Sequence, residues 1–291
     1  MKNTQANLVV SELEKMSAIA IVEDERVQSK FIQLFNHIHG TQSGELIYHK
    51  EKFNFLKQLQ ENPALQQCTK LSLYGAFLDA AVNGLSLETG NKPQSYLIPR
   101  PINVGTKNEP RYEKRVSLTV SPYGELIMRM RAGQIKHADD PVIVYEGDIF
   151  EIEMNETGKK IIYKPVIPRK SNQIIAGFIR IIKPDDSIDF FWLLKDDIQR
   201  LKGYSEKQNK GKANQLYTSN DGQIDTGFLA AKIIKHAFSS YPKVRTGEFT
   251  KLQTQEIEEK SIDYGINIPP HTEDGEIIDA ESEQIDNEET F

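Results

Sequence analysis

The stretch RVSLTVSPYGELIMRMRAGQ, residues 115–134, decides how the middle of the chain folds. In its first six residues, the polar side chains Arg115, Ser117 and Thr119 alternate with the apolar side chains Val116, Leu118 and Val120. This alternation predicts a half-buried strand. Ser121 then fits an N-cap, Pro122 the first helical position and Gly133 a left-handed C-terminal cap. We therefore expect a strand that leads directly into a helix over residues 122–132.

Gly124 stands in the first turn of that helix. Glycine inside a helix costs about 1 kcal/mol relative to alanine, so some group is expected to approach this backbone closely. Two interpretations stay open. The N–H groups of the helix start suit a phosphate, and a glycine also lets a helix pack tightly on a strand.

Length and composition limit the class of protein. The 291 residues, 38% of them hydrophobic, are enough for one large domain or two modest ones with a buried core. Cys68 is the single cysteine, which excludes an internal disulfide framework and a cysteine-cluster metal site and fits a reducing cytosol. The apolar runs are far shorter than the roughly 20 residues of a membrane span, so we expect a soluble, intracellular protein without a membrane partner.

Charge is distributed unevenly along the chain. Residues 251–291 contain 13 acidic and 2 basic residues, a net charge of -11. Residues 1–250 contain 34 basic and 29 acidic residues, a net charge of +5. A basic body with an acidic tail is typical of proteins that bind polyanions.

The pattern of hydrophobic residues predicts an α+β protein. Helical spacing dominates residues 1–65, which we interpret as a helical, oligomer-contact region, and a further helix is expected from Lys70 to Val82. After residue 90, short β-rich segments predict a twisted, mostly antiparallel sheet within a core over residues 66–250. A polar loop is expected at 203–223, then an amphipathic helix, and finally a disordered acidic tail over 251–291.

Motifs for nucleotide or metal chemistry are absent from the sequence. No G-x-G-x-x-G follows a strand, and neither G-x-x-x-x-G-K-[ST] nor H-E-x-x-H occurs, so no cofactor is expected. Paired aspartates at 139–140, 185–186 and 196–197 are the residues a metal-dependent nuclease would use, although turns and helix starts also favour aspartate. A metal-dependent nuclease and an adaptor protein acting through its acidic tail stay open as alternatives.

Two pairs of basic residues lie on expected helices. Arg129 and Arg131 follow the strand-to-helix turn, and Lys232 and Lys235 lie three residues apart on a later helix, so they share a side. The two pairs together predict a phosphate clamp. The alternative for the lysines is an ordinary solvated basic face.

Several segments in a fixed order resemble the RecT family of phage single-strand annealing proteins. These are FLDAAVNGL (77–85), QSYLIP (94–99), SPYGELIMRMRAGQI (121–135), VYEGDIFEIE (144–153) and the helix around Lys232. Arg131 falls where the family has R-x-G-Q, and Lys232 matches a family lysine. The turn SPYG departs from the family pattern, because it lacks the usual lysine or arginine.

The resemblance implies a curved, mostly antiparallel sheet backed by helices, similar to the core of lambda Red beta, with a basic groove for DNA. It implies ATP-independent binding of single-stranded DNA and annealing of complementary strands in phage-type recombination, by a ring or helical filament of copies rather than by an enzyme. The expected DNA-binding residues are Arg131, Lys232, Arg129, Lys235, Arg115, Lys114, Arg111, Arg100, Tyr123, Lys107 and Tyr96.

The resemblance also implies partners and a location. Besides single-stranded DNA and the annealed duplex, the expected partners are further copies of the chain, a phage 5'-to-3' exonuclease and a host single-strand-binding protein. The acidic tail is the candidate contact for the last two. The expected location is the cytoplasm of the bacterial host.

Overall fold

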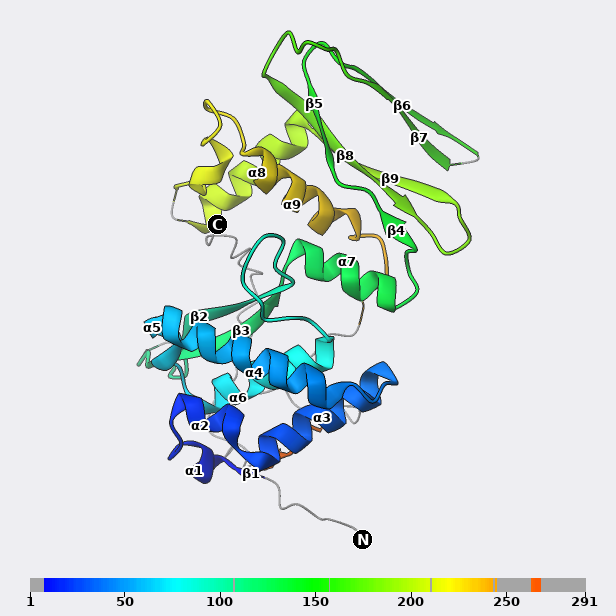
Figure 1. Ribbon diagram of the computed structural model, residues 1–291. Coiled ribbons are helices and arrows are strands. Elements are labelled where there is room, and N and C mark those ends of the chain that lie inside the picture. The colour runs from blue at the N-terminus through cyan, green and yellow to red at the C-terminus, as the bar shows by residue number, and fades with distance from the viewer. Residues whose placement is uncertain are drawn as a thin grey trace. The chain divides into compact units, whose positions relative to one another are not determined.

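The computed structural model describes residues 8–106, 108–156, 158–209, 211–242, 244 and 263–267 (Figure 1). They divide into two compact units. The first contains the described residues up to Gly124 together with 244 and 263–267, and the second contains those from Glu125 to Pro242. The three-part division expected from the sequence placed its first boundary at residue 65. The compact units divide later because the N-terminal helices share one apolar core with the helix that follows them.

The first unit joins helices to a long hairpin. Its elements are β1 (Leu8–Val9), α1 (Val10–Leu13), α2 (Ala18–Glu23), α3 (Glu25–His39), α4 (Gly44–Glu61), α5 (Pro63–Gln66), α6 (Lys70–Asn83), β2 (Ser95–Asn103), β3 (Tyr112–Val120) and β10 (Ile266–Asn267). Strands β2 and β3 pair antiparallel over their full length. Strands β1 and β10 form a short parallel pair.

Helix α6 lies at the centre of this unit. Twelve of its residues, from Ser72 to Asn83, are buried. On one side, the Phe77 ring packs 4.9 Å from Phe31 and 5.2 Å from Phe55, which come from α3 and α4. On the other side, Val116 of β3 donates its backbone N–H to the Ser72 hydroxyl over 3.1 Å. The helix ends where the sequence predicts, at Gly84, whose φ of 63° is left-handed.

The strand-to-helix stretch folds as predicted. Helix α7 spans Pro122–Arg131, the Ser121 hydroxyl caps it by accepting the Gly124 N–H over 2.9 Å, and Gly133 ends it with a φ of 67°. A Cβ on Gly124 would lie 2.0 Å from the Gln94 carbonyl oxygen. The close approach is therefore that of a carbonyl oxygen, which would repel a phosphate. This favours the packing interpretation of Gly124 over the phosphate interpretation.

The second unit is a layered α+β structure. Besides most of α7, it contains β4 (His137–Ala138), β5 (Val142–Tyr145), β6 (Ile149–Asn155), β7 (Gly158–Lys164), β8 (Ile174–Ile182), β9 (Ile188–Leu194), α8 (Lys195–Gln208), the 3-10 helix η1 (Gln215–Tyr217) and α9 (Thr226–Ala237). Strand β8 pairs antiparallel with β4, β5 and β9, and β6 pairs antiparallel with β7. The expected antiparallel sheets backed by helices are thus confirmed (Figure 1).

Alternation along β8 separates the two faces of its sheet. Gly177 leaves room for α9, whose Ile233 side chain comes within 2.5 Å of where a Cβ would stand. The next residue, Phe178, points the other way and stacks 5.7 Å from Phe150 of the β6–β7 hairpin. Helix α9 therefore covers one face of the sheet and the hairpin covers the other.

Two segments differ from the sequence-based expectation. The segment 141–154, expected as one strand, breaks into β5 and β6 because Gly147 adopts a φ of 95° and the Asp148 carboxylate accepts the Tyr145 N–H over 3.0 Å. Helix α8 continues through Gly203 to Gln208, where a loop was expected. No atom lies within 4 Å of a Cβ placed on Gly203, so this glycine marks no close contact and does not interrupt the helix.

Most of the expected acidic tail, residues 251–262 and 268–291, lies outside the described residues, so its disorder stays a prediction. Residues 263–267 are described and lie against the first unit, where Tyr264 is 4% exposed. Among the described helices, none combines the length and the apolar character needed to cross a membrane.

A pair of glycine substitutions tests the packing at the start of α7. Gly124→Ala forces a Cβ against the Gln94 carbonyl and is expected to lower the free energy of unfolding by about 1–3 kcal/mol. Gly203→Ala, also inside a helix but in open space, is expected to raise it by up to about 1 kcal/mol. Chemical denaturation of both variants gives the comparison. Equal effects of the two substitutions would contradict the packing role of Gly124.

Candidate nucleic-acid interface

The β2–β3 hairpin has one apolar face and one face that carries arginines. Val116 is fully buried, Leu97 on the same face of β2 is 6% exposed, and both belong to the core around α6. Because side chains alternate along a strand, Arg115 and its partner Arg100 lie on the opposite face. Val116 packs in the core around α6 and Leu118 packs against it, as the predicted alternation along β3 requires.

Arg100 and Arg115 are direct cross-strand partners. Side chains in such positions have Cβ atoms about 4.5–5.5 Å apart, and like charges there destabilise the pair of strands. Glu113 partly offsets this, since its carboxylate lies 3.3 Å from the Arg115 guanidinium. Burial lowers the pKa of Arg100, but arginine stays protonated at physiological pH. The pair is a concentrated positive charge held by the backbone register.

Further basic and aromatic side chains lie toward the tip of the same hairpin. Arg111 and Lys114 are exposed, and the Lys114 ammonium bonds the Gln67 side chain. Tyr112, at the start of β3, is 65% exposed, which is unusual for a tyrosine on a strand. Lys107 lies outside the described residues.

The two expected tyrosine contacts occupy different settings. Tyr96 pairs with Thr119 on the arginine-bearing face of the hairpin and is half-buried. Tyr123 lies in the first turn of α7, and the Lys92 ammonium stands 5.3 Å from its ring centre. Lys92 is thus a basic residue near the SPYG turn that the sequence pattern did not single out, because it lies on the chain before β2.

Arg129 is buried, with 6% of the residue exposed. Its guanidinium donates to Glu125, to Gln134 and to the carbonyl oxygen of Pro242, each over 2.6 Å, and lies 5.2 Å from the centre of the Phe238 ring. These contacts fasten α7 to the chain that follows α9. Arg129 is therefore placed to hold the second unit together, and its role as a phosphate contact stays a prediction that this position does not favour.

Arg131, two residues further along, is exposed at the end of α7. Partial desolvation lowers the pKa of its guanidinium, yet an arginine remains charged under all physiological conditions. Of the two arginines on this helix, Arg131 is the one a ligand in solution can reach.

The two lysines of α9 also differ in exposure. Lys232 is 3% exposed, and its ammonium lies 5.0 Å from the Phe228 ring centre and 6.0 Å from that of Tyr217. It lines a small pocket of about 190 Å³, together with Tyr217 and His236. Lys235 is exposed. The expected clamp therefore has Arg131 and Lys235 at the surface and Arg129 and Lys232 within the second unit.

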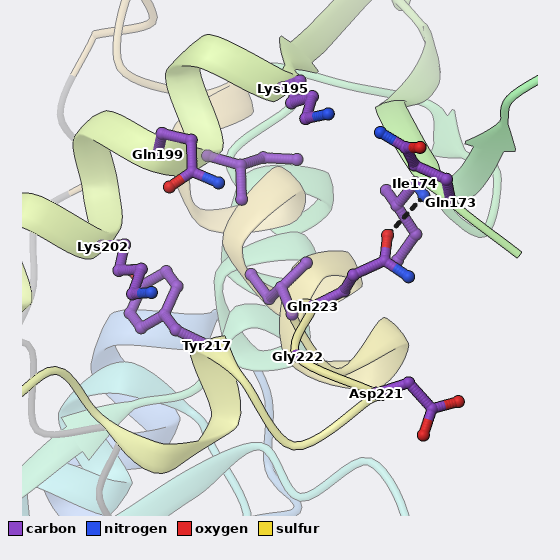
Figure 2. A pocket seen from close by; sticks show the side chains of 11 residues that line it. Gln173, Ile174, Lys195, Gln199, Lys202, Tyr217, Asp221, Gly222 and Gln223 are labelled. Atoms are coloured by element: carbon purple, nitrogen blue, oxygen red, sulfur yellow. Dashed lines mark hydrogen bonds between the residues drawn. The ribbon is translucent and has the colours of Figure 1, made fainter.

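A larger pocket of about 320 Å³ opens beside α8 (Figure 2). Three polar side chains project from that helix along one side of the pocket: Lys195, Gln199 and Lys202. Gln223 lies across from them, and its side-chain oxygen accepts the Ile174 N–H over 2.7 Å. Ammonium groups beside amide groups suit a phosphate and a base edge. The sequence signal that could have identified this set is the spacing of four and then three residues between the polar side chains on α8.

The paired aspartates take part in local structure. At least one member of each pair accepts a hydrogen bond: Asp139 from Arg180 over 2.6 Å, Asp185 from the Ser187 N–H and Asp186 from Lys136 over 3.0 and 2.5 Å, and Asp197 from the Leu194 N–H over 3.0 Å. Within the part of the chain that the structure describes, no group of three or more histidine, cysteine, aspartate or glutamate side chains is arranged to hold a metal ion. These contacts agree with the interpretation of the pairs as turn and helix-start residues.

Comparison with known proteins places this surface in context. No curated protein matches the chain significantly. A model of the RecT family matches residues 50–223, more than half of the chain. The match includes the hairpin, α7, the sheet and α8, and it ends before α9, so it does not cover Lys232 and Lys235. The chain therefore belongs to the RecT family, whose proteins anneal single strands in phage-type recombination.

Proposed function

We propose that this protein binds single-stranded DNA and anneals complementary strands without ATP, and that the outer face of the β2–β3 hairpin is a main contact surface. The observation that carries the proposal is the register pair Arg100–Arg115. The pair places two positive charges on one face of the hairpin, where the phosphate backbone of a strand can neutralise them. Tyr96, which lies on the same face, adds a ring on which bases can stack.

The second unit supplies a further set of contacts in this proposal. Arg131 and Lys235 are exposed, and Lys195 and Lys202 line the pocket beside α8. Arg129 and Lys232 support this set from within, by holding α7 and the wall of the smaller pocket. In this proposal the accessible basic side chains contact phosphates, and the buried ones, Arg129 and Lys232, hold the surrounding structure in position.

The mechanism follows from charge neutralisation. Basic side chains replace the counterions of one strand, so the strand binds through its phosphates and its sequence is not read. Base edges left outward can then test Watson–Crick pairing with a second strand. The DNA supplies specificity, and the protein supplies alignment and charge relief.

The proposal includes assembly and partners. A single copy contacts few phosphates, so copies side by side on one strand gain affinity through multivalency. The acidic tail is our proposed contact for a 5'-to-3' exonuclease or a host single-strand-binding protein, in the cytoplasm of the bacterial host.

Annealing itself is tested with labelled complementary oligonucleotides mixed without ATP. The protein is expected to accelerate duplex formation at low salt, more weakly as salt rises, because phosphate contacts are screened. Duplex formation is followed by energy transfer between the labels and strand length by gel. No acceleration would refute the proposal, and strands shortened on addition of magnesium would favour a nuclease.

The hairpin surface is tested by removing its arginine pair. The double substitution Arg100→Ala, Arg115→Ala is expected to weaken binding to single-stranded DNA. It should also reduce the slope of log affinity against log salt by about 1.4, at 0.7 per phosphate contact. Fluorescence anisotropy across a salt series measures both effects. Lys57→Ala, which removes an exposed charge from α4, serves as the control and is expected to leave the slope unchanged.

Substitution of the two arginines on α7 distinguishes a role in stability from a role in DNA binding. Arg129→Ala removes a buried, charged donor to three acceptors and is expected to lower the free energy of unfolding by about 3 kcal/mol. Arg131→Ala is expected to change stability by less than about 0.5 kcal/mol and to lower the salt slope by about 0.7. Thermal unfolding and anisotropy on both variants make the comparison. If Arg131→Ala destabilises the protein and Arg129→Ala does not, the assignment of their roles is wrong.

A further inference from the structure

Residues 263–267, which we call the anchor segment, are held in a slot of the first unit. Tyr264 is 4% exposed, and its hydroxyl donates to the carboxylate of Asp79, itself 1% exposed, over 2.6 Å. The Tyr74 hydroxyl in turn donates to the Tyr264 carbonyl oxygen. A tyrosine with its ring in the core and its hydroxyl on a buried carboxylate is a specific contact, because few other side chains satisfy that carboxylate at that depth.

Backbone and charge contacts extend the fit on both sides of Tyr264. Leu8 donates its N–H to the Gly265 carbonyl over 3.2 Å and pairs with Ile266 in the parallel β1–β10 ladder. The Lys30 ammonium lies 2.7 Å from the Asp263 carboxylate and lowers its pKa. Gly265 has a φ of 70°, and a Cβ there would lie 3.0 Å from the Lys30 side chain, so glycine is favoured at this position.

Among the described residues, those that contact the anchor segment come from the N-terminal part of the chain. They belong to β1, α3 and α6, whereas the anchor segment comes from near the C-terminus. The 18 residues 245–262 connect the segment to the described chain after α9. Extended at about 3.3–3.6 Å per residue, they reach roughly 60 Å. That exceeds the size of a compact unit, whose radius of gyration is about 13 Å for 100 residues.

A connection of this length can deliver the anchor segment to a second copy. The slot offers the same contacts to the segment of any copy, so an exchange between copies loses none of them. The choice between a copy's own segment and that of a neighbour is then set by effective concentration, which is high for both when copies lie side by side on one strand.

We propose that in the assembled protein the anchor segment of one copy occupies the slot of the next copy. This inference rests on the proposed assembly of copies on single-stranded DNA. A segment-to-slot contact joins two different surfaces, so it is heterologous, and each added copy presents a new segment and a new slot. Such a contact links copies into a ring or an open filament rather than into a closed dimer.

The ion pair between Lys30 and Asp263 can be crosslinked, and the crosslink tests whether anchor segments are exchanged between copies. Unlabelled and ¹⁵N-labelled full-length protein are mixed at high salt, assembled on a long single-stranded oligonucleotide at low salt and treated with a carbodiimide, which joins Lys30 to Asp263. Mass spectrometry of the joined peptides reports whether their two halves carry the same label. The Lys50–Glu88 pair, 3.0 Å apart and within the first unit of one copy, is the control and is expected to give same-label pairs alone.

The expected result is mixed-label Lys30–Asp263 pairs in the proportion given by random pairing of copies. Same-label pairs alone, in particles that light scattering shows to contain several copies, would overturn the exchange and leave the proposed function standing. If DNA binding yields no particle larger than one copy, the proposed assembly fails and the exchange fails with it. The two failures are therefore distinguishable.

A substitution in the anchor gives an independent readout. Tyr264→Ala is expected to shorten the assemblies, while affinity for an oligonucleotide that spans a single copy stays within twofold, because Tyr264 belongs to no proposed DNA contact. Tyr264→Phe keeps the ring in the slot and loses the bond to Asp79, so an intermediate length is expected. If Tyr264→Ala leaves particle size unchanged while circular dichroism shows a native fold, the segment does not link copies.

Discussion

The burial of α6 is the constraint on which the first unit depends. A helix that is apolar nearly all round must be covered on every side. The N-terminal helices cover one side, and the hairpin covers another. Its few polar side chains then determine how the covering elements fit. Ser72 accepts a backbone N–H of β3, and Asp79 accepts the Tyr264 hydroxyl, so each buried polar group fixes one neighbour in place.

The position of the basic surface follows from that packing. With Val116 against α6, strict alternation sends Arg115 to the other face, and the antiparallel register sets Arg100 beside it. A slip of one residue would place both guanidinium groups against the core. The apolar contacts of the hairpin therefore supply the free energy that holds two like charges together.

Local signals in the sequence were sufficient for the strand-to-helix unit. Ser121, Gly133 and Gly84 act through chain neighbours within a few residues, so their roles could be predicted without knowing the fold. Exposure could not be predicted in the same way. Arg129 is buried where it donates to the carbonyl oxygen of Pro242, 113 residues away in the sequence. Lys232 is buried beside aromatic rings that include that of Tyr217. Helical spacing shows which side chains share a face, but it does not show what covers that face.

The anchor segment shows that amino-acid composition, like helical spacing, does not reveal which side chains are buried. A long acidic run predicts a solvated chain, yet one tyrosine within it reaches the core. The free energies involved are nearly balanced. Burying the ring contributes about 3 kcal/mol and each of the three hydrogen bonds, to Asp79, from Tyr74 and from Leu8, about 0.5–1.5 kcal/mol, whereas ordering five residues costs about 1–2 kcal/mol each. A contact with so small a net free energy is specific without being permanent. Because a copy's own segment and that of a neighbour make the same contacts, their relative local concentrations decide which one fills the slot in the proposed assembly.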